Sequence, residues 1–291
     1  SNNSWTKAFH LISPKSLVLD VGCSSGNFGA ALIKRRGRIV DGIEIRIDDA
    51  KIADKHLRKV YPIDIEKDDL SPIKERYDVI YFGDVIEHLI DPAKTLKRVK
   101  ILLKPKGKIV FSIPNMAHAT IRLLLLAGDF EYTETGLLDK THLHFYNLQE
   151  VERVFNEAGY TIDNIDFIEK DYPDRLIDKN LKSLGLSASE KFYELMHKPE
   201  AAAFQFVGSA VADESPKSLK RKQFGPIDLF ESYYSDTVKN YEDVVAQTKK
   251  ELTDSNNRAE KLQNELDNIL SSKSWAYISR LRKIKRPFSK S

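Results

Sequence analysis

Cysteine is almost absent from this chain, because Cys23 is the only one among 291 residues. A single cysteine excludes a disulfide framework within the chain, which fits a reducing compartment. The sequence has no run of about 18 apolar residues, so we expect no membrane-spanning segment. The first residues, SNNSWTKAFH, lack the basic and apolar pattern of an export signal, so we expect a cytoplasmic protein.

A strong net charge is also lacking, since the chain carries only +3 overall, but the charge is unevenly distributed. Residues 215–291 hold 16 Lys and Arg against 10 Asp and Glu, which leaves the first 214 residues at −3. The composition therefore predicts an acidic domain over 1–214, a basic linker over 215–235 and a helical tail over 236–291. We expect the acidic and basic parts to meet different partners.

Short apolar runs alternate with helical patterns through the first two thirds of the chain. Runs rich in Val and Ile, separated by helices, are typical of a parallel sheet that is covered on both faces. The runs expected to be strands are 17–22, 38–45, 59–65, 77–85 and 107–115, with two later ones at 160–170 and 202–212. The fold class is therefore α/β.

The segment 116–150 interrupts this rhythm with a leucine-rich helix and a polar loop. We expect this insertion to lie over the carboxyl ends of the strands, where α/β sheets bind ligands.

A glycine-rich turn, Asp20 to Gly26, follows the first strand and precedes a helix. Gly22 permits a tight turn, and Gly26 is expected to let the backbone approach a ligand closely. Turns of this kind also bind dinucleotides and phosphates. However, no basic residue accompanies this one, and the second half of a dinucleotide domain is missing.

Two acidic residues at later strand ends narrow the choice of ligand. Glu44 closes the second strand, where a carboxylate can accept two hydrogen bonds from a ribose diol. Asp64 closes the third strand, where its carboxylate would meet an adenine amino group while a neighbouring isoleucine packs on the ring. The alternative is that both are solvated strand ends. Their common register with the glycine turn favours an adenosyl site.

Four blocks carry a resemblance to a known family: LVLDVGCSSGNFG, YDVIYFGDVIEHLIDP, LKPKGKIVFSIPN and GDFEYTETGLLDKTHLHFYN. Residues 17 to about 212 resemble class I S-adenosylmethionine-dependent methyltransferases, and the last block resembles a subgroup associated with bacterial polysaccharide biosynthesis. The resemblance implies a Rossmann-like seven-stranded sheet with the last strand antiparallel. The implied cofactor is S-adenosylmethionine, with S-adenosylhomocysteine as the product. The family's second turn glycine is Ser24 here, which removes some conformational freedom.

The expected cofactor contacts combine this resemblance with the strand-end argument. They are Asp20, Gly22, Ser24, Gly26, Asn27, Glu44, Ile45, Asp64, Ile65, Phe82, Gly83 and Asp84.

A hydroxyl acceptor needs a general base within hydrogen-bond reach, and histidine suits that role. His142 is the first candidate for the base or a substrate ligand, followed by His144 and then His88. Because His142 and His144 alternate along an extended segment, we expect at most one of them to meet the substrate. The alternative is that either one only ties the loop to the domain.

Asp84, Glu87 and His88 stand at helical spacing and could hold a divalent metal ion. We favour the alternative, in which Glu87 and His88 cap the cofactor pocket, and we expect no metal site. His118 is expected to be a loop residue, and Cys23 is expected to fill a small buried space rather than to react.

The tail carries apolar residues in steps of four and three, which is a heptad seam. The seam consists of Tyr241, Val245, Thr248, Leu252, Ser255, Ala259, Leu262, Leu266 and Ile269. It predicts a homo-oligomer or docking on a partner helix, with an amphipathic helix on the chain's own domain as the alternative. The basic end around Trp275, Ile278 and Leu281 favours peripheral contact with an anionic membrane over nucleic acid, and a solvated helix end remains open.

The sequence thus predicts an O-methyltransferase acting on a sugar hydroxyl of a surface glycan or its precursor. The alternative enzyme is a small-molecule methyltransferase acting on a quinone- or phenol-type acceptor. A third reading is a non-catalytic scaffold that acts through its coiled coil.

Overall fold

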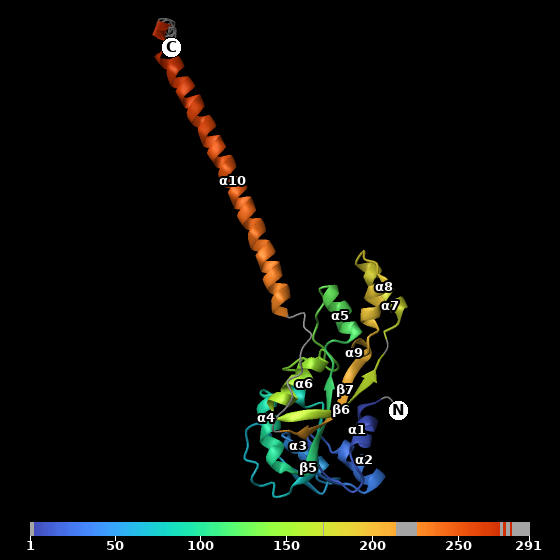
Figure 1. The fold of residues 1–291 in the computed structure, drawn as a ribbon. Coiled ribbons are helices and arrows are strands. Elements are labelled where there is room, and N and C mark those ends of the chain that lie inside the picture. The colour runs from blue at the N-terminus through green and yellow to red at the C-terminus, as the bar shows by residue number, and fades with distance from the viewer. Residues whose placement is uncertain (1–2, 171, 214–225, 274–275, 278–279, 281–291) are drawn as a thin grey trace, which may run out of the picture. The chain divides into compact units, whose positions relative to one another are not determined.

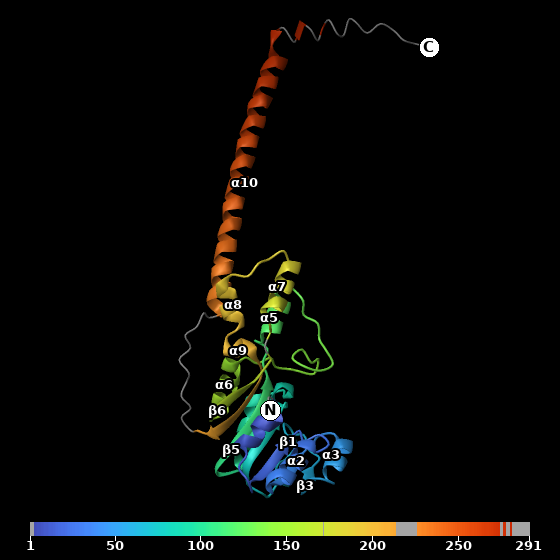
Figure 2. The ribbon, with the colours of Figure 1, turned by 90° about the vertical axis from the view of Figure 1, so that its right-hand side faces the viewer.

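The computed structural model describes residues 3–170, 172–213, 226–273, 276–277 and 280, without the side chains of Arg36 and 226–243. The chain divides into two compact units, Ser1–Leu219 and Lys220–Ser291 (Figures 1 and 2). The predicted boundary at 214–215 falls among residues 214–225, outside the described residues.

A single seven-stranded sheet organises the first unit, in the order β3-β2-β1-β4-β5-β7-β6. Strand β7 runs antiparallel to both of its neighbours, and the pairs among β1 to β5 are parallel. The strands are β1 Leu17–Val21, β2 Ile39–Ile43, β3 Lys59–Tyr61, β4 Tyr77–Gly83, β5 Leu103–Pro114, β6 Tyr160–Glu169 and β7 Ala203–Ala212. The predicted Rossmann-like sheet is therefore confirmed.

Helices cover both faces of this sheet because strand side chains alternate between two apolar cores. Leu19 and Phe82 pack on the face covered by α4 and α6, whereas Val18 and Val79 pack on the face covered by α1, α2 and α3 (Figure 1). The helices are α1 Ser4–Leu11, α2 Asn27–Arg36, α3 Ile47–Ala53, α4 Pro92–Val99, α5 Ala119–Leu126, α6 Leu148–Glu157, α7 Asp174–Ser183, α8 Glu190–Met196 and α9 Pro199–Ala202, with 3₁₀ turns η1 Ile86–His88 and η2 Lys100–Leu102.

The N-terminal helix α1 was not predicted from the sequence. Asn3 caps it, since its side chain accepts a 2.8 Å hydrogen bond from the Thr6 amide. Phe9 stacks on Phe28 of α2 with ring centroids 5.1 Å apart, and Phe28 stacks in turn on Tyr81 of β4 at 4.2 Å. The helix therefore contributes to the core on one face of the sheet.

Strand β3 ends at Tyr61, four residues earlier than predicted. Pro62 follows directly, and a proline has no amide hydrogen to donate to the strand ladder. Asp64 therefore lies in the loop after the strand rather than at its end.

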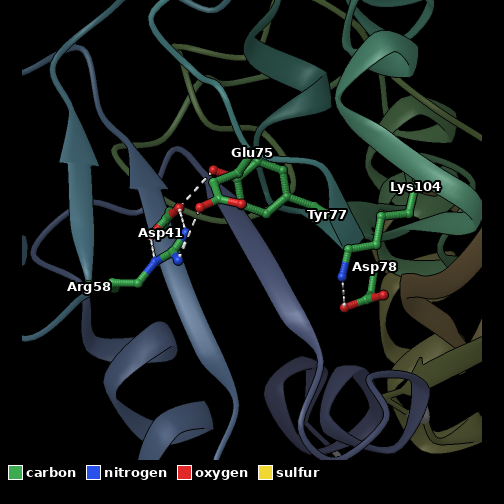
Figure 3. A network of polar contacts seen from close by, with 6 residues as sticks. All are labelled: Asp41, Arg58, Glu75, Tyr77, Asp78 and Lys104. Atoms are coloured by element: carbon green, nitrogen blue, oxygen red, sulfur yellow. Dashed lines mark hydrogen bonds and ion pairs between the residues drawn. The ribbon is translucent and has the colours of Figure 1, made fainter.

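A polar network joins β2, β4 and the start of β3 around Asp41, which is fully buried (Figure 3). The Arg58 guanidinium donates to both carboxylate oxygens of Asp41, at 2.8 and 2.6 Å, and the Tyr77 hydroxyl donates at 2.8 Å. Lys104 and Asp78 form a more exposed pair at 2.9 Å. Because Tyr77 begins β4, this network lies away from the carboxyl ends of the strands.

The insertion after β5 consists of α5 and a long loop. Helix α5 packs on α7 and α8 through Leu123, Ile177 and Met196. The amides of Leu143 and His144 both donate to the Glu87 carbonyl, at 2.9 and 3.1 Å. Since Glu87 follows β4, the loop is held at the carboxyl ends of the strands, as predicted.

The second unit contains one helix of 46 residues, α10 Pro226–Ser271. It begins inside the segment predicted as linker, because Pro226 is a favourable first helical residue and the following sequence continues the helix. The seam residues Val245, Leu252 and Leu262 are 50–65% exposed. The coiled coil itself stays a prediction.

The predicted basic end lies largely outside the described residues, which include neither Trp275, Ile278 nor Leu281. Among the described residues, no helix is both long and apolar enough to cross a membrane.

Candidate functional site

The glycine turn between β1 and α2 bends through three residues with positive φ: Gly22, Ser24 and Gly26, at 69°, 46° and 79°. A Cβ on Gly22 would lie 2.6 Å from the side chain of Val85, so only glycine fits there. A Cβ on Gly26 would meet Ala53 of α3 at about 3 Å. Gly26 thus allows close packing of α2 on α3, and its approach to a ligand stays a prediction.

Ser24 holds a left-handed conformation without being glycine, and Glu44 stabilises the turn around it. The Ser24 amide donates to Glu44 Oε2 at 2.8 Å, and the Arg46 amide donates to Oε1 at 2.9 Å. A carboxylate has about four acceptor positions, so each Glu44 oxygen keeps one for a ligand. Glu44 is 5% exposed and follows β2 directly.

A cavity of about 370 Å³ opens beside this carboxylate, and we name it the Glu44 cavity. Ile45, Ile90 and Leu143 are 57–63% exposed at its wall, and such apolar surfaces suit a flat ring. It is lined by Val21, Gly22, Ile43, Glu44, Ile45, Ile63, Asp64, Ile65, Glu66, Lys67, Val85, His88, Leu89, Ile90 and Leu143. Five predicted cofactor residues therefore meet here: Gly22, Glu44, Ile45, Asp64 and Ile65.

Asp64 also lines this cavity, but its carboxylate has other partners. Oδ1 accepts from the Glu66 amide at 2.8 Å, and Oδ2 lies 3.3 Å from the Lys67 ammonium. The carboxylate thus stabilises its own loop, and its side chain is more exposed than that of Glu44, at 17% against 6%.

Seven predicted cofactor residues do not line the Glu44 cavity: Asp20, Ser24, Gly26, Asn27, Phe82, Gly83 and Asp84. Phe82 is fully buried in the core, and Asn27 is exposed and bonds to Ser25. Asp20 is 3% exposed, and its Oδ2 has no hydrogen-bond partner among the described residues. Burial and then the charge of Glu44 raise the pKa of Asp20 to about 8. Any cofactor contact from Phe82 or Asp20 would have to come from the backbone.

A second cavity, of about 280 Å³, adjoins the first and shares His88 with it; we name it the histidine cavity. It is lined by Asp84, Glu87, His88, Pro114, Gly136, Asp139, His142, Phe204 and Gln205. One ligand-capable atom each of Glu87, His88 and His142 lie within 4.8 Å of one another. The structure thus brings two of the three predicted histidines together.

The third histidine, His144, is not part of this cluster. Its Nε2 lies 3.3 Å from the Ile90 carbonyl, so it ties the loop to the domain. His88 Nδ1 lies 3.1 Å from the Thr141 carbonyl, which makes Nδ1 the protonated nitrogen and leaves the lone pair on Nε2. His142 lines the histidine cavity and His144 does not, while the expectation that at most one of them meets the substrate stays a prediction.

Burial shapes the electrostatics of the cluster. Glu87 is 1% exposed, and its pKa is raised well above the ordinary value by burial and by the neighbouring Asp84 charge. The pKa of His142 is lowered, first by burial and then by His88. His142 Nδ1 and Glu87 Oε2 are both buried and have no hydrogen-bond partner among the described residues.

Asp84 does not share a helical face with Glu87 and His88, because η1 spans only Ile86–His88. Asp84 has a φ of 56°, so its backbone is not helical, although it lines the same cavity as Glu87 and His88. Its Oδ1 accepts from the Ser112 hydroxyl at 3.0 Å and also from the Gln205 amide. Sequence reasoning missed Gln205, whose only signal was a lone amide side chain within an apolar strand.

Two other candidates have structural roles. His118 is 2% exposed, caps α5 at the Thr120 amide and bonds to the Lys170 carbonyl at 2.9 Å. Cys23 is 6% exposed, and burial raises the pKa of its thiol, so it is poorly reactive.

Comparisons with known proteins show the family to which the chain is similar. Residues 4–165 match the profile of a family described as a methyltransferase domain. The ubiquinone biosynthesis O-methyltransferase of Coxiella burnetii (strain Dugway 5J108-111) is 32% identical, over 49% of this chain and 79% of the relative. The enzyme of the same name from Actinobacillus pleuropneumoniae serotype 5b (strain L20) is 28% identical, over 44% of this chain and 64% of the relative.

The chain thus spans just under two thirds of the Actinobacillus relative's length. Among solved structures, magnesium protoporphyrin IX methyltransferase from Synechocystis PCC 6803, with bound S-adenosylhomocysteine, aligns at a TM-score of 0.48 and 14% identity. That alignment covers 73% of this chain and 83% of that one.

Proposed function

Because the chain belongs to the methyltransferase domain family, we propose that it methylates a hydroxyl oxygen of a small-molecule acceptor. Membership of the family confirms the predicted S-adenosylmethionine-dependent methyltransferase and its cofactor. The acceptor, the oxygen and the residues that act on them are what we propose.

The Glu44 cavity suits the cofactor. Glu44 keeps two open acceptor positions for a ribose diol, and the exposed faces of Ile45 and Ile90 would be covered by an adenine ring. S-adenosylmethionine supplies there a methyl group on a positively charged sulfur. The fit rests on a buried, backbone-anchored carboxylate beside an apolar cavity wall.

The histidine cavity suits the acceptor, since it shares the His88 wall with the cofactor cavity. His142 is our candidate for the general base. Its lowered pKa keeps the ring neutral near pH 7, and the unpartnered Nδ1 can take the hydroxyl proton. That buried, unpartnered nitrogen is the observation that carries the proposal.

The acceptor class is argued from the loop and from the relatives. Phe130, Tyr132 and Phe145 expose aromatic faces, and Phe145 lies 6.5 Å from the His142 ring between centroids. Such faces stack on a flat ring. The two relatives named as ubiquinone biosynthesis O-methyltransferases support the small-molecule alternative over the predicted glycan acceptor.

The proposal is tested in two steps on the full chain. Calorimetric titration with S-adenosylhomocysteine should show one site, and the absence of binding would leave only the non-catalytic scaffold. Incubation with S-adenosylmethionine and a panel of phenols, quinols and sugars should add one methyl group to a phenolic acceptor, detected by mass spectrometry. His142→Ala should lower that rate at least tenfold, while His144→Ala should keep most of it. If only sugars were methylated, the glycan acceptor would be supported and the phenolic acceptor rejected.

A further inference from the structure

We propose that Glu87, His88 and His142 bind a divalent transition-metal ion in the histidine cavity. The sequence led us to expect no metal ion at this place. The role of the ion beside an acceptor rests on the proposed function, whereas the binding of the ion does not.

The three side chains come from two segments that the fold brings together. Glu87 and His88 belong to η1, directly after β4, and His142 belongs to the insertion loop. Their ligand atoms lie within 4.8 Å of one another. Atoms about 2.1 Å from one ion in tetrahedral geometry lie about 3.4 Å apart. Side-chain rotations that close up to about 1.4 Å would therefore complete the site.

Two of the three groups each have one buried atom without a hydrogen-bond partner among the described residues. Glu87 Oε2 and His142 Nδ1 are buried without a hydrogen bond to a described residue. Leaving a buried polar atom unpaired costs about 1–3 kcal/mol, and a positive ion would satisfy both atoms at once.

The third group, His88, is oriented as metal-bound histidines usually are. Its Nδ1 bonds to the Thr141 carbonyl at 3.1 Å, which leaves the Nε2 lone pair available for an ion. Thr141 precedes His142, so the loop that carries one ligand also orients another.

Charge favours a cation in this cavity. The described residues that line it include three carboxylates, Asp84, Glu87 and Asp139, but neither lysine nor arginine. Two imidazole nitrogens and one carboxylate oxygen suit zinc, manganese, iron or cobalt better than magnesium or calcium, which prefer oxygen ligands alone.

Three protein ligands leave a fourth position open, as in catalytic zinc sites. An acceptor hydroxyl bound at that position would have a lowered pKa and would release its proton to solvent. The oxygen would then form its bond to the methyl carbon as the carbon–sulfur bond breaks and sulfur keeps the electron pair. With an ion bound, His142 acts as a ligand, and the ion replaces it in activating the hydroxyl.

The test uses the full chain without an affinity tag, treated with a chelator and dialysed. Titration with Zn²⁺ in a calorimeter should show one ion per chain, and Co²⁺ should give the visible absorption of a nitrogen- and oxygen-ligated ion. Glu87→Gln and His142→Ala should each weaken Zn²⁺ binding by more than about tenfold. His144→Ala is the matched control, because His144 lies in the same loop but outside the cluster.

Each outcome decides the proposal. Zn²⁺ binding that is absent, or that is unchanged in both Glu87→Gln and His142→Ala, overturns it. If S-adenosylhomocysteine still binds in that case, the proposed function stands and only the ion is rejected. A further outcome is that Zn²⁺ does not bind, and that Glu87→Gln weakens the binding of S-adenosylmethionine but not that of S-adenosylhomocysteine. The Glu87 carboxylate then interacts with the positively charged sulfur of the cofactor, and the metal site is rejected. Circular dichroism of each variant separates lost ligation from lost folding.

Discussion

The imidazole rings of His88 and His142 meet edge to face, with centroids 4.9 Å apart and planes inclined by 66°. One ring follows β4, and the other comes from the insertion between β5 and α6. Their meeting makes the insertion part of the candidate site rather than only a cover for it. The predictions below test how the surrounding residues support the two cavities.

Asp20 should make the free energy of unfolding fall as the pH rises from about 4 to 8. Its folded pKa is about 8 and its ordinary value is 3.8, so the folded chain retains a proton that the unfolded chain has released. Asp20→Asn should remove that slope and gain up to a few kcal/mol at pH 8, with little change at pH 4. Urea unfolding of both proteins at pH 4, 6 and 8 measures this, and parallel slopes would contradict it.

Glu44 should contribute more to cofactor affinity than Asp64. Glu44→Ala removes the acceptor of two backbone amides together with the proposed ribose contacts. The Kd for S-adenosylhomocysteine should rise about 10- to 100-fold, as expected for hydrogen bonds to a charged group. Asp64→Asn should change it less, because the Asp64 carboxylate is more exposed than that of Glu44 and asparagine keeps one acceptor oxygen. Calorimetry on both variants decides, and a larger effect at Asp64 would reverse the ranking.

Ser24→Gly should stabilise the fold. Ser24 has a φ of 46°, which costs a residue with a side chain about 1 kcal/mol relative to glycine. The greater freedom of glycine in the unfolded chain offsets part of the gain, so the free energy of unfolding should rise by about 0.5 kcal/mol. Ser24→Ala, which keeps a Cβ, should show no gain in urea unfolding. A loss of stability in Ser24→Gly would show that the hydroxyl matters more than the backbone.

Arg58→Met should destabilise the fold without weakening cofactor binding. It leaves the fully buried Asp41 with only Tyr77 as a partner, which should cost about 1–3 kcal/mol. Lys104→Met is the control shown in Figure 3, since Asp78 is 41% exposed and such pairs contribute less than about 1 kcal/mol. Thermal unfolding with and without S-adenosylhomocysteine tests both effects. Equal losses in the two variants would contradict the role of burial.

The heptad seam predicts self-association of the full chain. Leu252 is 61% exposed on α10 and lies on the seam, whereas Asn257 lies off it. Leu252→Glu should therefore lower the average mass in sedimentation equilibrium, and Asn257→Glu should not. A monomer mass for the unmodified chain at every concentration would leave α10 as a single helix.

The parts of the fold that depend on residues close together in the sequence were predictable from the sequence. A strand, a glycine turn and a helix follow one another at residues 17–36 as expected, because each is set by local pattern and turn chemistry. The seven strands were likewise visible as apolar runs. The early end of β3 follows from Pro62, which has no amide hydrogen to donate to the strand ladder.

The rest depended on tertiary contacts. The meeting of His142 with His88, and of Gln205 with Asp84, joins segments that only the folded sheet brings together. The helical spacing of Asp84 with Glu87 suggested a shared face, but the left-handed backbone at Asp84 breaks it. The packing of Gly26 against Ala53 of α3 is likewise a tertiary contact that the spacing of the turn does not show.

The Glu87 carbonyl accepts hydrogen bonds from Leu143 and His144, while the side chain of Glu87 faces the histidine cavity. Glu87 therefore connects the position of the loop with the presence or absence of a ligand in the histidine cavity. Ligand binding and loop ordering are therefore thermodynamically linked. If the ordered loop strengthens the binding of a ligand to Glu87 and His142, that ligand stabilises the ordered loop by the same free energy. Substitutions in the loop that touch no ligand should therefore still change affinity, and ligands should slow hydrogen exchange at the Leu143 and His144 amides.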